Sequence, residues 1–158
     1  MVSGENSGSS APPLPPDQDA SSSYFLHNGD TPGAQLVSQP LSDENYHTWN
    51  RSMTMALIAK NKFGFVNGTL LKPSEDNPLF NSWIRCNTMV LSWILNSLNK
   101  DIAASVIFIE SAADVWKDLQ ERFSHSNGPR IFQLRKAIFS LSQEQLSVSA
   151  YFTHLKAL

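Results

Sequence analysis

The chain has 158 residues, a formal net charge of −2 and a hydrophobic content of 41%, which suits one domain with a core and is too little for two large ones. Its single cysteine, Cys86, excludes an internal disulfide and a multi-cysteine metal site, and we expect this thiol to be buried on a helix. The sequence shows no signal peptide and no long apolar run. We therefore expect a cytoplasmic, non-secreted protein that does not enter a membrane.

Charge is distributed unevenly along the chain. No Lys or Arg precedes Arg51, whereas residues 51–158 hold all 12 bases and 8 of the 14 acids, a net charge of +4. This mild excess is smaller than the clustered basic stripe that marks a nucleic-acid groove. We therefore expect at most weak RNA binding by this chain.

The first 42 residues are expected to contain a tail and an arm. Residues 1–23 are rich in Ser, Gly and Pro and cannot bury enough apolar surface to offset the entropy lost on ordering, so we expect disorder there. Residues 24–42 combine turn-forming and apolar residues, which indicates an extended arm that docks on a helical surface. His27 is also expected to hydrogen-bond that surface. The predicted docking residues are Tyr24, Phe25, Leu26, His27, Leu36 and Val37.

A first helix is predicted over residues 43–60. Ser42 is placed as its N-cap, with Asp43 and Glu44 in the first turn, where the helix dipole favours acids. Apolar residues then recur at spacings of three and four, which is the helical period. This stripe comprises Tyr46, Trp49, Met53 and Leu57.

After a compact turn over residues 63–68, a second helix is predicted from Asn77 to Asn99. Asn77 is suited to the N-cap, and Pro78 to the first helical position, because that position needs no backbone N–H. The helical period continues through the segment and makes it the expected centre of the core. Its stripe comprises Leu79, Trp83, Cys86, Val90, Trp93 and Ile94.

Further helices are predicted towards the C-terminus. Residues 101–107 also fit a buried strand, but Ala103 and Ala104 favour a helix. Ser111 and Asp114 resemble a capping box that begins another helix. That helix carries Val115, Trp116, Leu119 and Phe123 on one face, and later helices begin near residues 129 and 147.

The predicted class is all-α, a small orthogonal bundle of five or six helices preceded by an extended arm. The helical domain covers residues 43–158 and ends in mid-helix, so we expect it to be truncated at the C-terminus. Aromatic residues at helical spacing are expected to form the core or an interface rather than stacking platforms for bases, with Trp49 and Trp83 partly exposed near the arm. These aromatic residues are Tyr46, Trp49, Trp83, Trp93 and Trp116.

No pattern in the sequence points to catalysis. The four histidines lie far apart in different elements, and no Gly-rich phosphate loop or Ser elbow occurs. We expect no catalytic residue, no cofactor and no metal. One basic group has two open interpretations, a solvated helix face or contacts to RNA phosphates. It comprises Arg122, Arg130, Arg135 and Lys136.

An ordered series of residues from Tyr24 onwards carries a resemblance to a known family. The series comprises Tyr24, Leu26-His27, Asp30-x-Pro32, Leu36-Val37, Leu41, Asn45-Tyr46, Trp49, Met53, Ala56-Leu57, Lys60-x-Lys62-x-Gly64-Phe65-Val66-x-Gly68, Pro73, Trp83, Asn87, Val90, Ser92-Trp93-Ile94, Ala113-x-x-Trp116-x-x-Leu119, Phe123, Arg130-Ile131, Leu134, Leu141, Gln143, Ser147-Val148-x-x-Tyr151-Phe152 and Leu155-Lys156. In this order the residues resemble the N-terminal Gag, or capsid-like, region of plant copia-type LTR retrotransposon polyproteins.

The resemblance implies a non-enzymatic, capsid-like helical protein. Its partners would be other copies of itself, assembled into a particle that packages element RNA, with no membrane and no small-molecule substrate. RNA binding by this chain is expected to be weak. Two alternatives stay open: a nucleic-acid-binding module that uses a basic helix over residues 130–136, and a domesticated host adaptor domain.

Overall fold

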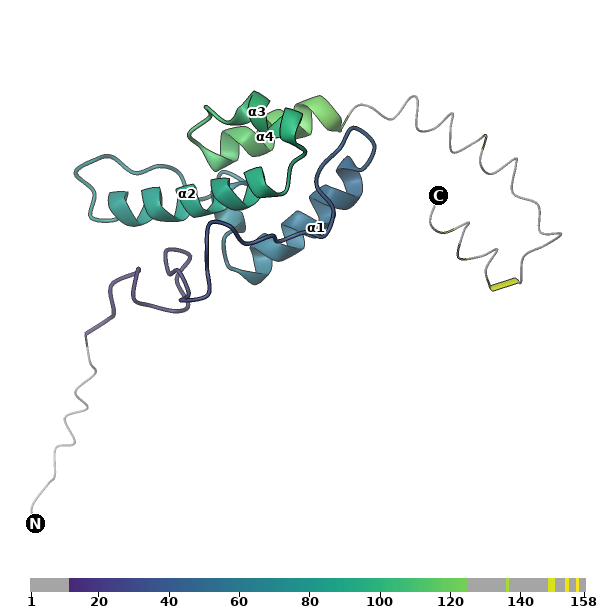
Figure 1. Ribbon diagram of the computed structural model, residues 1–158. Coiled ribbons are helices and arrows are strands. Elements are labelled where there is room, and N and C mark those ends of the chain that lie inside the picture. Colours follow the sequence, from purple (N-terminus) through teal and green to yellow (C-terminus); the bar gives the residue numbers. More distant parts are fainter. Residues whose placement is uncertain (1–11, 125–135, 137–147, 150–152, 154–155, 157–158) are drawn as a thin grey trace, which may run out of the picture.

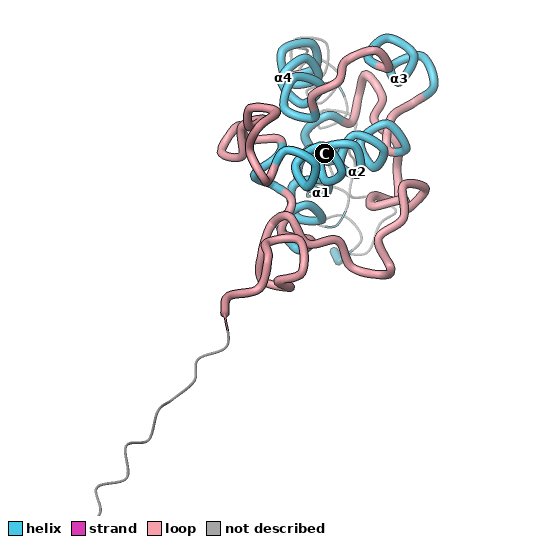
Figure 2. Tube along the Cα trace, turned by 90° about the vertical axis from the view of Figure 1, so that its left-hand side faces the viewer, coloured by secondary structure: helices cyan, strands magenta, loops and turns pink. Residues whose placement is uncertain are grey.

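A computed structural model describes residues 12–124, together with isolated positions beyond residue 135. Its helices are α1 (Tyr46–Ala59), the 3₁₀ helix η1 (Phe63–Phe65), α2 (Phe80–Asn96), α3 (Lys100–Val106) and α4 (Ala112–Phe123). In Figures 1 and 2, α3 and α4 lie together on one side of the α1–α2 pair. The all-α class is confirmed for this part of the chain. The helices predicted from residues 129 and 147, and with them the total of five or six, lie outside the described residues.

Helix α1 places its predicted stripe in the core. All four stripe residues are buried, because a spacing of three and four returns each to the same face. The predicted N-cap was wrong: Asn45 precedes the helix, and no acid lies in the first turn. The side-chain oxygen of Asn45 accepts the N–H of Ser42 at 2.8 Å, which closes a turn over the residues that had been assigned to the helix.

Helix α2 begins and ends inside its predicted bounds. The side-chain oxygen of Asn77 accepts the N–H of Leu79 at 2.8 Å, which makes a turn that precedes the helix at Phe80. At the other end, Leu41 donates its N–H to the carbonyl of Ser97 at 2.8 Å and accepts from the N–H of Asn99 at 3.1 Å. Leu41 thereby forms a parallel bridge with Leu98, and this pairing ends α2 before the predicted Asn99.

Helices α3 and α4 have local start signals that the sequence reveals. Asn99 caps α3 by accepting the N–H of Asp101, and the preference for a helix over a strand in this segment is confirmed. Ser111 is the N-cap of α4 and accepts the N–H of Asp114, as predicted. The side-chain oxygens satisfy backbone donors that have no partner within the helix.

The aromatic residues of the helical stripes form the core. Tyr46, Trp83, Trp93 and Trp116 are buried, and so is Trp49. The ring centre of Trp49 on α1 lies 5.5 Å from that of Trp116 on α4. The expectation that Trp49 and Trp83 are partly exposed was wrong, since they are 2% and 5% exposed. Each indole is held inside because its Nε1 donates to a backbone carbonyl, at 2.8 Å for Trp49 and 2.9 Å for Trp83.

The predicted turn between α1 and α2 contains η1 and supports the arm. Phe65 is 1% exposed. The centre of its ring lies 6.0 Å from the ring centre of Tyr24 and 6.2 Å from that of Trp83. Gly68 closes the turn with a φ of +79°, a conformation that glycine adopts without strain. The turn therefore joins the N-terminal arm to the first half of α2.

Candidate interaction surfaces

The arm crosses the helices within the same chain. In Figure 1 the dark blue segment that precedes α1 passes between α1 and α2. It is a series of turns rather than one extended strand, because the N–H of Asp30 bonds the carbonyl of His27 and that of Ala34 bonds Thr31. Contacts with the helical part begin at Ser21, whose carbonyl accepts from Asn61 at 3.0 Å, three residues before the predicted start of the arm.

We call the surface beneath the arm the arm groove, formed by Asn61, Lys62, Cys86, Trp93 and Asn96. Three of its donors, Cys86, Trp93 and Asn96, lie on α2. Trp93 donates from Nε1 to the carbonyl of Thr31 at 2.8 Å, and Asn96 donates from Nδ2 to the carbonyl of Pro32 at 2.6 Å. Both bonds bind the arm through its backbone, so they fix its path without selecting its side chains.

The next two donors bind consecutive carbonyls of the arm. The Nζ of Lys62 donates to Phe25 at 2.7 Å, and the thiol of Cys86 donates to Tyr24 at 3.2 Å. Lys62 is only 1% exposed, and Cys86 is fully buried, as expected. Burial disfavours the charged form of each group, so it lowers the pKa of Lys62 and raises the pKa of Cys86.

One ion pair also joins the arm to α1. The Nζ of Lys60 lies 2.5 Å from Oδ1 of Asp30, whose side chain is 2% exposed, and 4.9 Å from the ring centre of Trp93. Burial by itself raises the pKa of Asp30, but hydrogen bonds from Lys60 and from the N–H of His27 outweigh burial and hold that pKa below its usual value. The pair is therefore a charged anchor for the middle of the arm.

The predicted docking residues occupy different positions. Val37 is buried, and Tyr24, Leu26 and Leu36 are half-buried against the core. Phe25 is half-buried. Its ring packs edge-on against that of His27, with 4.8 Å between the ring centres. The side chain of His27 is exposed and contacts the arm itself, while its N–H donates to Asp30.

The groove donors were not identified from the sequence as arm-binding residues. Lys60, Lys62 and Asp30 belong to the series of residues that carries the family resemblance, but no local pattern assigned them a role. Asn61 and Asn96 had no signal, because a polar residue at a helix end is usually solvated. Their role depends on contacts across 40 and 64 residues of sequence, which no local pattern encodes.

The predicted basic group is only partly described. Arg122 donates to Ser105 at 2.8 Å and to Asp118 at 3.1 Å, and its guanidinium lies 5.2 Å from the ring centre of Phe123. Lys136 is exposed, whereas Arg130 and Arg135 lie outside the described residues. Arg122 is thus occupied by contacts within the domain, and the described residues do not assemble a basic patch around it.

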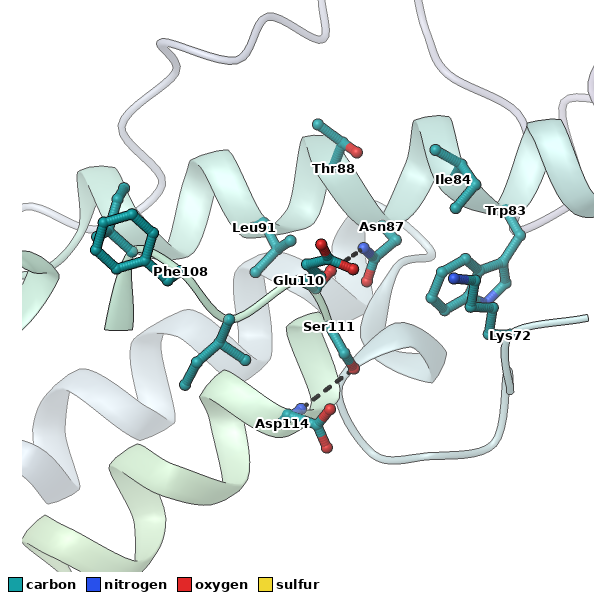
Figure 3. A pocket seen from close by; sticks show the side chains of 12 residues that line it. Lys72, Trp83, Ile84, Asn87, Thr88, Leu91, Phe108, Glu110, Ser111 and Asp114 are labelled. Carbon is teal, nitrogen blue, oxygen red and sulfur yellow. Dashed lines mark hydrogen bonds between the residues drawn. The ribbon is translucent and has the colours of Figure 1, made fainter. Parts of the chain in front are cut away.

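A second surface lies on the other side of α2, and we call it the open groove. Figure 3 shows this groove, of about 520 Å³, between α2 and the loop that connects α3 to α4. Asn87 fixes the loop because its amide donates to the carbonyl of Glu110 at 2.7 Å and accepts the N–H of Ala112 at 2.9 Å. Beside the groove, Ile107 and Phe108 are 51% and 93% exposed. The open groove is therefore a surface of mixed apolar and polar side chains, with an exposed aromatic ring at Phe108.

No group of three or more His, Cys, Asp and Glu residues in the described part of the chain is arranged to hold a metal ion. No helix in that part is long and apolar enough to cross a bilayer. The described residues form two candidate interaction surfaces, the arm groove and the open groove.

Comparisons with known proteins found two sequence similarities. Residues 27–74, which run from the arm through α1 and η1 to the loop before α2, match the family model of the Gag-polypeptide of LTR copia-type. The chain is also 20% identical over 124 residues to the retrovirus-related Pol polyprotein from transposon RE1 of Arabidopsis thaliana. That similarity covers 73% of this chain and 8% of the polyprotein. No solved structure gives a significant match.

In this helical protein, residues 27–74 match the copia-type Gag family model. The match confirms the resemblance predicted from the sequence. The chain spans only a small part of the polyprotein that it matches, so that protein's other activities do not transfer to it.

Proposed function

We propose that this chain is a non-enzymatic Gag, or capsid-like, protein that self-associates in the cytoplasm into a particle packaging element RNA. The observation that carries the proposal is the copia-type Gag match over residues 27–74. The matched segment includes Asp30, Lys60 and Lys62, whose contacts hold the arm on the helices. The family similarity therefore falls on a packed structural unit.

The open groove is the surface that we assign to the contact between copies. Burial of a phenylalanine side chain contributes about 1.5–3 kcal/mol, and Phe108 leaves that contribution unused in the single chain. A second copy fits because each copy offers a protruding ring beside a groove that carries both apolar and charged side chains. The groove lining also carries Lys72 together with Glu110 and Asp114, so opposite charges are available across a two-fold contact.

Sedimentation velocity at rising protein concentration tests self-association. We expect the wild-type chain to associate and Phe108→Ser to stay monomeric at concentrations where the wild type has associated. Ile58→Ser is the matched control, because Ile58 is 59% exposed on α1 and does not line the open groove. A wild-type chain that sediments as a monomer at every concentration would contradict the proposal.

RNA packaging has a separate test. Particles treated with ribonuclease are expected to retain protected RNA, which extraction and sequencing would identify. Empty particles would contradict packaging and leave self-association standing. Binding of RNA by the monomer, with a steep salt dependence that weakens in Arg135→Ala, would support a nucleic-acid-binding module instead. A monomer without RNA affinity would support a host adaptor.

A further inference from the structure

The arm and the helices are joined mainly through the backbone of the arm. Four side chains of the arm groove donate to arm carbonyls between residues 24 and 32. A fifth donor, Asn61, extends the row to Ser21. Such a surface binds any segment that follows the same path, and the charge of Asp30 opposite Lys60 then fixes the register.

The groove requires an occupant. Lys62 is 1% exposed, and the arm carbonyl of Phe25 is the acceptor for its ammonium group. Trp93 is fully buried beneath the arm and donates to Thr31. Removing the arm without a replacement leaves these donors without their acceptors and exposes an apolar surface, and both changes are unfavourable.

The connection between the arm and the helical domain has the properties of a hinge. Ser38, Gln39 and Pro40 are exposed, and they separate buried Val37 from buried Leu41. A small cleft of about 40 Å³ lies between this connection and α1, and one hydrogen bond, from Nδ2 of Asn45 to the carbonyl of Pro40 at 2.9 Å, holds the connection beside the start of the helix. The residues on either side of the hinge can therefore keep their contacts while the hinge changes its path.

We propose that the arm groove also accepts the arm of a second copy of this chain, so that neighbouring copies exchange arms through the hinge at residues 38–40. Every contact of the exchanged arm is the same as in the single chain, because both copies carry the same arm and groove. Exchange therefore costs little besides the entropy of association. Exchanged arms link copies through a surface separate from the open groove.

Concentration decides between the two arrangements. A short flexible tether holds its own arm near its own groove at an effective concentration of about a millimolar. Exchange becomes competitive only where copies are packed at a similar local concentration, as in an assembled particle. In this respect the inference rests on the proposed function, and it predicts little exchange in dilute solution.

A disulfide trap tests the exchange directly. The side chains of Ser23 in the arm and Asn61 in the groove lie in contact, with 3.2 Å between Oγ and Oδ1. One chain carries Ser23→Cys and a second, differently tagged chain carries Asn61→Cys, both in a Cys86→Ser background. After mixing at high concentration and mild oxidation, exchange yields a disulfide-linked pair that contains both tags.

The controls separate exchange from random contact. A chain with both Ser23→Cys and Asn61→Cys should form the link within one molecule in dilute solution, which shows that the geometry permits the bond. Replacing Asn61→Cys with Lys117→Cys, on an exposed position of α4, should abolish the mixed product. Failure to find the mixed product at high concentration overturns arm exchange. Sedimentation of the same samples measures self-association independently.

A second variant keeps the inference testable if the double-cysteine control does not link. Deleting Ser38 and Gln39 shortens the reach of the arm by about 7 Å, so the arm no longer returns to its own groove. We expect this variant to form a dimer at concentrations where the wild type is a monomer, even when it also carries Phe108→Ser. A folded, monomeric deletion variant would overturn the inference and leave the proposed function intact.

Discussion

Helix α2 has two faces with opposite surroundings, one covered by the arm and one open. One face carries Cys86, Trp93 and Asn96 and is covered by the arm, which brings backbone carbonyls that the donors bind. The other face carries Ile84 and Leu91 beside exposed Phe108, and no described segment covers it. The covered face stabilises the fold, whereas the open face is available to another molecule.

The difference shows how one helix combines stability with association. A covering segment without regular structure must find partners for its carbonyls, so the covered face contains polar donors between its apolar residues. No described segment covers the open face, which carries Ile84 and Leu91 together with the polar Asn87 and Thr88. Mutations on the two faces should therefore affect different measurements, stability on one side and self-association on the other.

The largest expected effect is on the covered face. Trp93→Ala removes a fully buried ring and should lower the free energy of unfolding by about 3–5 kcal/mol in urea titrations. Phe108→Ala, on the open face, should change it by less than about 0.5 kcal/mol. Trp93→Phe is the milder variant, and the loss of its bond to Thr31 should cost about 1 kcal/mol. Equal effects of Trp93→Ala and Phe108→Ala would remove the distinction between the faces.

The ion pair of the arm gives the next largest effect and a pH dependence. Asp30→Asn should lower the free energy of unfolding near pH 7 by about 2 kcal/mol, the range for a hydrogen bond to a charged group. The pKa of Asp30 in the folded chain lies below its usual 3.8, so the carboxylate stabilises the fold above pH 3.8. That contribution is lost as the pH falls through the lower, folded-state pKa.

Urea titrations of both chains across this pH range check the sign. The difference between the wild type and Asp30→Asn should shrink as the pH falls below about 4. Asp118→Asn breaks the half-exposed pair with Arg122 and should cost at most about 1 kcal/mol. A difference between the wild type and Asp30→Asn that stays constant down to the lowest pH would contradict the assigned role of the carboxylate.

The buried thiol reports on opening of the arm. Cys86 is fully buried and its pKa is raised by burial, so a thiol reagent should modify it slowly in the wild-type chain. If labelling follows the open population, a loss of about 2 kcal/mol in Asp30→Asn should speed it roughly thirtyfold. Phe108→Ser should leave the rate unchanged. Rapid labelling of the wild type would show that the arm does not protect this face.

The smallest stability effect expected is at the start of α4, beside the open groove. Ser111→Ala removes the oxygen that accepts the N–H of Asp114 and should cost about 1 kcal/mol. Ser111→Asp should retain most of the stability, because aspartate is also a good N-cap. A loss as large as that of Trp93→Ala would mean that the open face contributes to folding as much as the covered face does.

Helix positions were largely predictable because their signals are local. The stripe of α1 and the cap of α4 are patterns within a few residues, and both were confirmed. The start of α1 was misplaced because the side chain of Asn45 accepts the N–H of Ser42 and closes a turn before the helix, and the end of α2 because Leu41 pairs with Leu98. Each error arose where a contact from outside the helix changed a boundary.

The sequence by itself determined the all-α class of the described part, the buried stripes and the similarity of residues 27–74 to copia-type Gag, since periodicity, caps and ordered motifs are properties of neighbouring residues. Only the tertiary structure decided that Lys62 is buried beneath the arm, and that one face of α2 is covered while the other is open. The physical reason is distance along the chain: Trp93 and Thr31 are 62 residues apart, and their bond exists only after the arm has folded back onto the helices.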